Sequence, residues 1–102
     1  MKVRILIVDD EKKITEMLSR YLTMEGYEVD SVNNPQEALV KIENENYGVV
    51  ITDIVMPDMN GLDLLKEIKN VNGLIQVIVM TGYVAMENIL TAFRLGASNC
   101  FF

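Results

Sequence analysis

Two apolar stretches of the sequence each end abruptly in carboxylates. Residues 5–8 are followed by Asp9 and Asp10, and residues 49–52 are followed by Asp53. Short runs of β-branched and aliphatic residues are typical of strands buried on both faces, so the acids are expected at the mouth of a sheet. If the two strands are parallel neighbours, roughly 4.8 Å apart, the three carboxylates crowd into one small volume.

Such a group of acids predicts a cation site. Carboxylates this close repel one another, and a bound cation removes the repulsion. The sequence has no histidine and a single cysteine, Cys100, so the ligands on offer are oxygen atoms. Oxygen-only sites suit a hard ion, and Mg²⁺ is the predicted metal.

The rest of the chain alternates between strand and helix patterns. Strands are predicted at residues 3–8, 27–32, 47–52, 75–80 and 99–102, and helices follow the first four. This alternation favours an α/β fold in which a parallel sheet carries helices on both faces. Ligands of such sheets bind outside the carboxyl ends of the strands, where the winding direction switches. Thr81 follows the fourth strand and is therefore expected in the same crevice as the acids.

Local signals set the ends of the predicted helices. The first helix is amphipathic, and glycine at position 26 stands where a helix stop is expected. Its apolar positions are Ile14, Met17, Leu18, Tyr21 and Leu22. The second helix begins with Asn34 as a cap and Pro35 at the first helical position, and Glu37 completes a capping box.

Composition narrows the classes of function. The 102 residues are enough for one domain, which we place at residues 1–102. A net charge of −6 argues against direct nucleic-acid binding by this chain, which needs a basic patch. No apolar run is long enough to span a membrane. A single cysteine without a signal peptide predicts a reducing, cytoplasmic location.

In combination, these motifs identify a family. The chain resembles the receiver domain of bacterial two-component response regulators from its first strand to its last residue. The matching segments are Val8-Asp9-Asp10, Asp53 with Met56-Pro57 and Asn60-Gly61, Met80-Thr81-Gly82, and Leu95-Gly96-Ala97. The resemblance implies a flavodoxin-like, doubly wound five-stranded sheet of strand order 2-1-3-4-5.

The resemblance also implies a role for each matched residue. Asp53 is the phosphoacceptor, which receives a phosphoryl group from a sensor histidine kinase in a Mg²⁺-dependent reaction. Asp10 is the main metal carboxylate, Asp9 assists through water, and Val55 adds its backbone carbonyl. Thr81 donates its hydroxyl to the arriving phosphoryl group. The domain then catalyses its own phosphorylation and slow dephosphorylation, and relays the signal by a conformational change without being a conventional enzyme.

The sequence departs from the family pattern at its end. Spacing from Thr81 and Gly96 puts the family's invariant lysine immediately after Phe102, where the sequence stops. The resemblance thus implies a receiver truncated within its last strand, without the final helix and without an output domain. We expect self-association through the sheet face that this helix covers in the family. Cys100 stands where the family has an aromatic switch residue.

Other interpretations compete with this one. Taken singly, Asp9 and Asp10 could favour a helix N-terminus, and Asp53 could be a turn residue. A flavin or nucleotide carrier would need a phosphate-binding loop where the sequence has acids. A phosphohydrolase with an aspartyl nucleophile usually separates its two acids by one residue, whereas Asp9 and Asp10 are adjacent. The remaining alternative is a receiver-like interaction module that is not phosphorylated in this truncated form.

Overall fold

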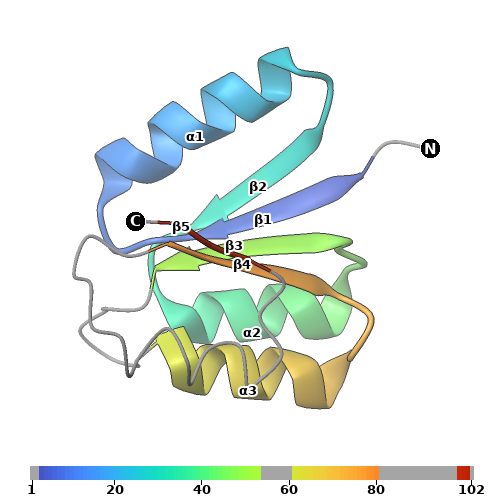
Figure 1. Ribbon diagram of the computed structural model, residues 1–102. Coiled ribbons are helices and arrows are strands. Elements are labelled where there is room, and N and C mark those ends of the chain that lie inside the picture. Colours follow the sequence, from blue (N-terminus) through green and yellow to red (C-terminus); the bar gives the residue numbers. More distant parts are fainter. Residues whose placement is uncertain (1–2, 54–60, 81–98, 102) are drawn as a thin grey trace.

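The computed structural model describes residues 3–53, 61–80 and 99–101. Strands and helices alternate along the chain (Figure 1). The elements are β1 (Arg4–Val8), α1 (Lys12–Met24), β2 (Glu28–Val32), α2 (Pro35–Asn44), β3 (Val49–Asp53), α3 (Gly61–Val71), β4 (Gln76–Met80) and β5 (Asn99–Phe101). The predicted helix between β4 and β5 lies outside the described residues.

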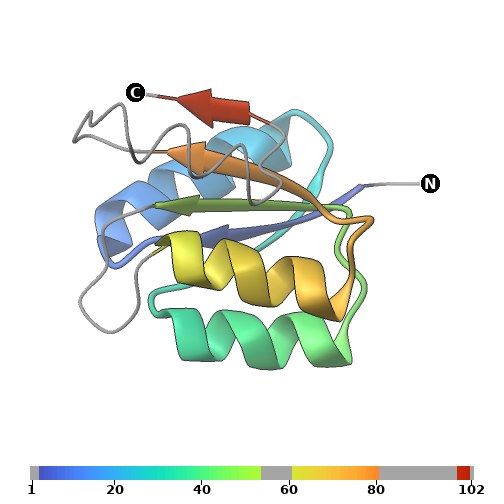
Figure 2. The ribbon, with the colours of Figure 1, turned by 60° about the horizontal axis from the view of Figure 1, so that its bottom comes forward.

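The strands form one parallel sheet in the order β2-β1-β3-β4-β5. The predicted fold class and strand order are therefore confirmed, and β2 lies at an edge as expected. Helix α1 covers one face of the sheet, whereas α2 and α3 lie side by side on the other (Figures 1 and 2). Among the described residues, no helix has both the length and the apolar character needed to cross a membrane.

The two faces of the sheet are covered to different extents. On the α2 and α3 side, the strand residues are completely buried, and they form the main core with both helices. These strand residues are Leu6, Val8, Val50, Thr52, Val77 and Val79. On the α1 side, Ile5 and Ile7 of β1 are buried, but positions 49, 51, 78 and 80 of β3 and β4 are only half-buried.

Helix α1 corrects one detail of the predicted amphipathic pattern. Ile14, Leu18 and Leu22 are half-buried, but Met17 and Tyr21 are 59% and 62% exposed. The buried residue Thr15 belongs to the inward face of the helix, whereas Met17 and Tyr21 do not. Periodicity identified the helix but included two apolar residues that point away from the sheet.

The predicted stop of α1 at Gly26 and the predicted start of α2, with Asn34 as cap and Pro35 next, are confirmed. Gly26 has a φ of 98° and follows the cap of α1, and the backbone N–H of Tyr27 donates to the Leu22 carbonyl. This is the six-residue closure of a Schellman motif, in which glycine tolerates the left-handed conformation. At the start of α2, the Asn34 side chain accepts a hydrogen bond of 2.8 Å from the Glu37 N–H, and Pro35 opens the helix.

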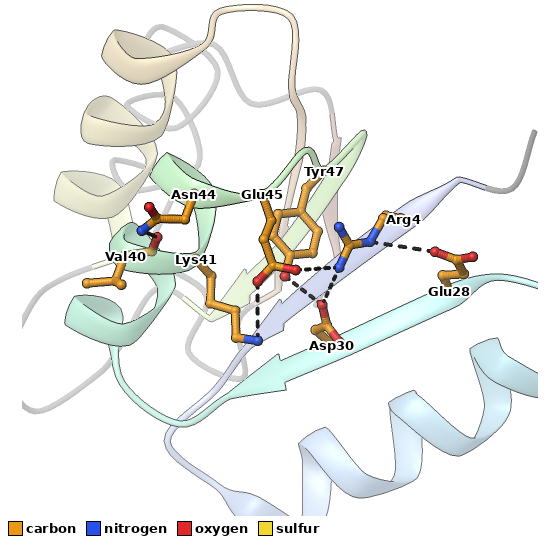
Figure 3. A network of polar contacts seen from close by, with 8 residues as sticks. All are labelled: Arg4, Glu28, Asp30, Val40, Lys41, Asn44, Glu45 and Tyr47. Atoms are coloured by element: carbon orange, nitrogen blue, oxygen red, sulfur yellow. Dashed lines mark hydrogen bonds and ion pairs between the residues drawn. The ribbon is translucent and has the colours of Figure 1, made fainter.

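At the amino ends of the strands, a polar network surrounds Arg4 of β1 (Figure 3). The Arg4 Nη2 atom lies 3.0 Å from Asp30 Oδ2 and 2.7 Å from Glu45 Oε1, and its guanidinium stacks over the ring of Tyr47. The Tyr47 hydroxyl donates to Asp30 at 2.6 Å. Glu28 also pairs with Arg4, so the network ties β1 and β2 to the segment between α2 and β3.

Candidate functional site

The acidic residues meet at the carboxyl ends of β1 and β3. The register pairs Val8 with Thr52, so the next residues along the two strands, Asp9 and Asp53, stand beside each other. Carboxylate oxygens of Asp9, Asp10 and Asp53 all lie within 4.8 Å of one another. Asp9 is buried, Asp53 is half-buried and Asp10 is exposed, so the cluster opens to solvent on one side.

The surroundings of Asp9 disfavour its negative charge. Burial raises the pKa of Asp9 to about 6, and the negative charges of Asp53 and Asp10 act in the same direction. A hydrogen bond of 2.9 Å from the Glu11 N–H to Asp9 Oδ1 opposes the shift but does not overcome it. The ionised form of Asp9 is therefore disfavoured in the folded protein.

Backbone and side-chain hydrogen bonds fix the segment that carries Asp9 and Asp10. The Asp9 N–H donates to the Val32 carbonyl at 3.3 Å, which extends the β1–β2 pairing by one step. Next to it, Asn33 Nδ2 donates to the Asp9 carbonyl at 3.0 Å and to the Thr15 hydroxyl at 3.2 Å. Thr15 Oγ1 in turn donates to the Lys12 carbonyl at 2.9 Å in the first turn of α1.

Sequence reasoning missed Asn33 and Thr15 as neighbours of the acidic cluster. The available signal was that Asn33 directly follows β2, because the carboxyl ends of parallel strands share one edge of the sheet. Thr15 had no such signal, since it lies within an ordinary helical pattern. Of the other predicted site residues, Val55 and Thr81 lie outside the described residues.

The donor set fits a hard divalent cation. Three carboxylates from two neighbouring strands present oxygen atoms at a spacing that one ion can bridge. Burial raises the pKa of Asp9, and the neighbouring charges of Asp53 and Asp10 add to the shift, so a cation bound here would favour the ionised form. Asp9, Asp10 and Asp53 are thus the described residues that would hold the predicted Mg²⁺.

A parallel sheet of this order is a doubly wound fold that binds ligands at its switch point, and here acids of β1 and β3 lie at that edge. The family model of the response regulator receiver domain matches residues 5–102. The chain therefore belongs to the receiver domain family of two-component response regulators.

Relatives and solved structures agree with this assignment. The chain is 39% identical over 97 residues to the transcriptional regulatory protein CpxR homolog of Haemophilus influenzae, a match covering 95% of this chain and 42% of that protein. It is 40% identical over 94 residues to the regulatory protein AtoC of Escherichia coli, with coverages of 92% and 20%. The chain thus spans less than half the length of these two relatives.

Three solved structures show the same fold. A CheY-like receiver domain protein from Methanospirillum hungatei has a TM-score of 0.96 at 37% identity, covering 99% of this chain and 81% of that one. The regulator TrrA from Thermotoga maritima, in complex with Mg²⁺ and BeF, has a TM-score of 0.88 at 40% identity, with coverages of 99% and 85%. A Burkholderia pseudomallei response regulator with a phosphorylated aspartic acid and a calcium ion has a TM-score of 0.93 at 26% identity, with coverages of 98% and 59%.

Proposed function

We propose that residues 1–102 form a phosphoacceptor switch module in which Asp53 receives a phosphoryl group from a sensor histidine kinase. The observation that carries the proposal is the meeting of Asp9, Asp10 and Asp53 within 4.8 Å at the carboxyl edge of the sheet. The magnesium complex and the phosphorylated aspartic acid of the two similar regulators support it.

Each acid has a separate task in the proposed reaction. A carboxylate oxygen of Asp53 attacks the phosphorus, the bond between phosphorus and the kinase histidine nitrogen breaks, and an acyl phosphate forms. Asp9, Asp10 and Asp53, with the Val55 carbonyl, would hold Mg²⁺, and Thr81 would donate its hydroxyl to a phosphoryl oxygen. When bound, Mg²⁺ would supply positive charge to offset the charge that gathers on the transferred oxygens. The new phosphoryl charge at the sheet edge then shifts the domain between conformations.

Intact mass measurement tests this function. Incubation with acetyl phosphate and Mg²⁺ is expected to add one phosphoryl group, and neither Asp53→Asn nor the protein in excess chelator should gain it. Asp63→Asn, which neutralises an exposed acid on α3, is the matched control and should be phosphorylated normally. An Asp53→Asn variant that still gains the group would place the phosphoacceptor elsewhere. A wild-type protein that never gains it would favour the unphosphorylated interaction module.

Two further proposals concern the cellular location of the domain and its self-association. The proposed phosphorylation by a histidine kinase and the single cysteine of the sequence support a location in the cytoplasm. An output domain or a separate effector would respond to phosphorylation there. We also infer self-association through the α1 side of the molecule, where β3 and β4 are incompletely covered and the outer surface of α1 exposes Met17, Tyr21 and Met24.

Light scattering tests the self-association. Tyr21→Glu is expected to reduce the measured mass toward that of a monomer. Val40→Glu, at an exposed apolar position on α2 on the opposite side, should leave the mass unchanged. A monomeric wild-type protein at micromolar concentration would contradict the inference.

A further inference from the structure

The Asn33 side chain connects three elements around the acidic cluster. It follows β2, and its Nδ2 atom donates to the Asp9 carbonyl at the end of β1 and to Thr15 in α1. A carbonyl oxygen can only accept, so the amide nitrogen is the atom that must face Asp9. Asn33 lies at the surface, yet both of its amide hydrogens are used inside the protein.

The bonds continue beyond Asn33 as a chain. Thr15 is 2% exposed, and its hydroxyl accepts from Asn33 while donating to the Lys12 carbonyl. The path therefore runs from β2 through Asn33 and Thr15 into the first turn of α1, and a branch holds the peptide of Asp9. Hydrogen bonds linked in this way reinforce one another, because each one polarises the next.

Asp9 and Asp10 lie in the segment between β1 and α1, and the Asn33 side chain contacts both sides of this segment. Asp9 is bonded through its N–H to Val32 and through its carbonyl to Asn33, and Glu11 donates to its side chain. The direction of the Asp10 peptide follows from that of the Asp9 carbonyl, since the two belong to one planar unit. The position of both carboxylates relative to Asp53 thus depends on Asn33.

We infer that Asn33 is a positioning residue for Mg²⁺ affinity, acting through the Asp9 carbonyl and the Thr15 hydroxyl. The inference rests on the proposed Mg²⁺ site at Asp9, Asp10 and Asp53. Groups that orient metal ligands without touching the metal typically change affinity by about 10- to 100-fold when removed. Asn33 acts on backbone rather than on a ligand atom, so we expect the lower end of that range.

The neighbouring Asn34 provides a matched control. Asn33 donates to the Asp9 segment, whereas Asn34 accepts from Glu37 and caps α2. Both lose side-chain hydrogen bonds on substitution by alanine, and loss of the Asn34 cap lowers the stability of the fold. A purely structural role for Asn33 would make Asn33→Ala behave like Asn34→Ala.

The test is a Mg²⁺ titration of the metal-free protein, followed by the NMR shifts of its backbone amides. Asn33→Ala is expected to raise the Kd for Mg²⁺ by about tenfold, whereas Asn34→Ala lowers the melting temperature but leaves the Kd unchanged. Thr15→Val should weaken binding less, because the bond to the Asp9 carbonyl survives. The double variant Asn33→Ala, Thr15→Val should bind no more weakly than Asn33→Ala alone.

Three other outcomes would overturn the positioning role of Asn33. An Asn33→Ala variant that binds Mg²⁺ as tightly as the wild type overturns the positioning role and leaves the proposed function standing. An equal loss of affinity in Asn34→Ala would also overturn it, because general destabilisation would then explain both. A wild-type protein that binds no Mg²⁺ overturns the proposed metal site and this inference with it.

Discussion

The two ends of the parallel sheet both gather carboxylates, but the surroundings of these acids differ. At the amino end, Asp30 and Glu45 surround Arg4, and Lys41 lies 3.5 Å from Glu45 (Figure 3). At the carboxyl end, Asp9, Asp10 and Asp53 converge on one another.

The pKa values of the two groups shift in opposite directions. The hydrogen bond from Tyr47 lowers the pKa of Asp30, and the one from Arg4 lowers the pKa of Glu45. Burial raises the pKa of Asp9, and the neighbouring acids raise it further. Acids at the amino end therefore stabilise the fold when ionised, whereas Asp9 costs stability when ionised. An ionised aspartate thus stabilises the fold at the amino end, as Asp30 does, and costs stability at the carboxyl end, as Asp9 does.

The largest effect is expected from removing the positive centre of the amino end. Arg4→Met keeps much of the aliphatic length but leaves Asp30, Glu45 and Glu28 without the guanidinium. The melting temperature at neutral pH should fall by several degrees. Because the carboxyl pKa values are lowered in the folded state, this contribution is present at neutral pH and is lost as the pH falls through them.

Arg20→Met is the control for that experiment. Arg20 is exposed on α1, and its replacement should change the melting temperature little. Thermal unfolding followed by circular dichroism compares the two variants across pH. Equal shifts in both would mean that the Arg4 network adds nothing beyond the general charge balance.

An opposite, smaller effect is expected at the carboxyl end. Asp9→Asn in the metal-free protein should raise the free energy of unfolding at neutral pH by about 1–2 kcal/mol, allowing for partial solvent screening. The folded-state pKa of Asp9 is raised to about 6 from an ordinary 3.8, so its protonated form is favoured by folding. Its favourable contribution is present below pH 3.8 and is lost as the pH rises through about 6.

The gain from Asp9→Asn should therefore be full above pH 6 and fade as the pH falls toward 4. Denaturant unfolding at several pH values measures it. Asp63→Asn removes an exposed acid from the first turn of α3 and should instead lose a few tenths of a kcal/mol, because the helix N-terminus favours negative charge. A loss of stability in Asp9→Asn at neutral pH would contradict the conclusion that ionised Asp9 costs stability.

The smallest effect concerns a single hydrogen bond of the amino end. Tyr47→Phe removes the 2.6 Å bond to Asp30 while keeping the ring under Arg4, and should cost about 0.5–1.5 kcal/mol at neutral pH. The cost should vanish in acid once Asp30 is protonated. Tyr27→Phe, at a partly exposed tyrosine, is expected to be neutral in the same denaturant titration. If Tyr27→Phe lowers the free energy of unfolding as much as Tyr47→Phe does, the hydrogen bond to Asp30 is not the cause of the loss.

Local sequence signals were sufficient for the described elements and for the acids that gather at the carboxyl edge of the sheet. Apolar runs ending in Asp9 and Asp53 marked the carboxyl ends of two strands, and Gly26 and Asn34 marked helix ends. These features depend on residues close together in the chain, so a pattern along the sequence can capture them. The strand order came from the family resemblance, which the periodicity alone could not supply.

Tertiary structure decided the interactions between distant segments. Asn33 and Thr15 are 18 residues apart, and Arg4 and Glu45 are 41 apart, so no local pattern links them. Both contacts exist because crossover connections bring β2 beside β1 and place the end of α2 near the start of the sheet. The sequence alone determined which acids gather. Only the packing of the strands brought Asp30 and Glu45 to Arg4 and brought Asp9, Asp10 and Asp53 together at the opposite edge.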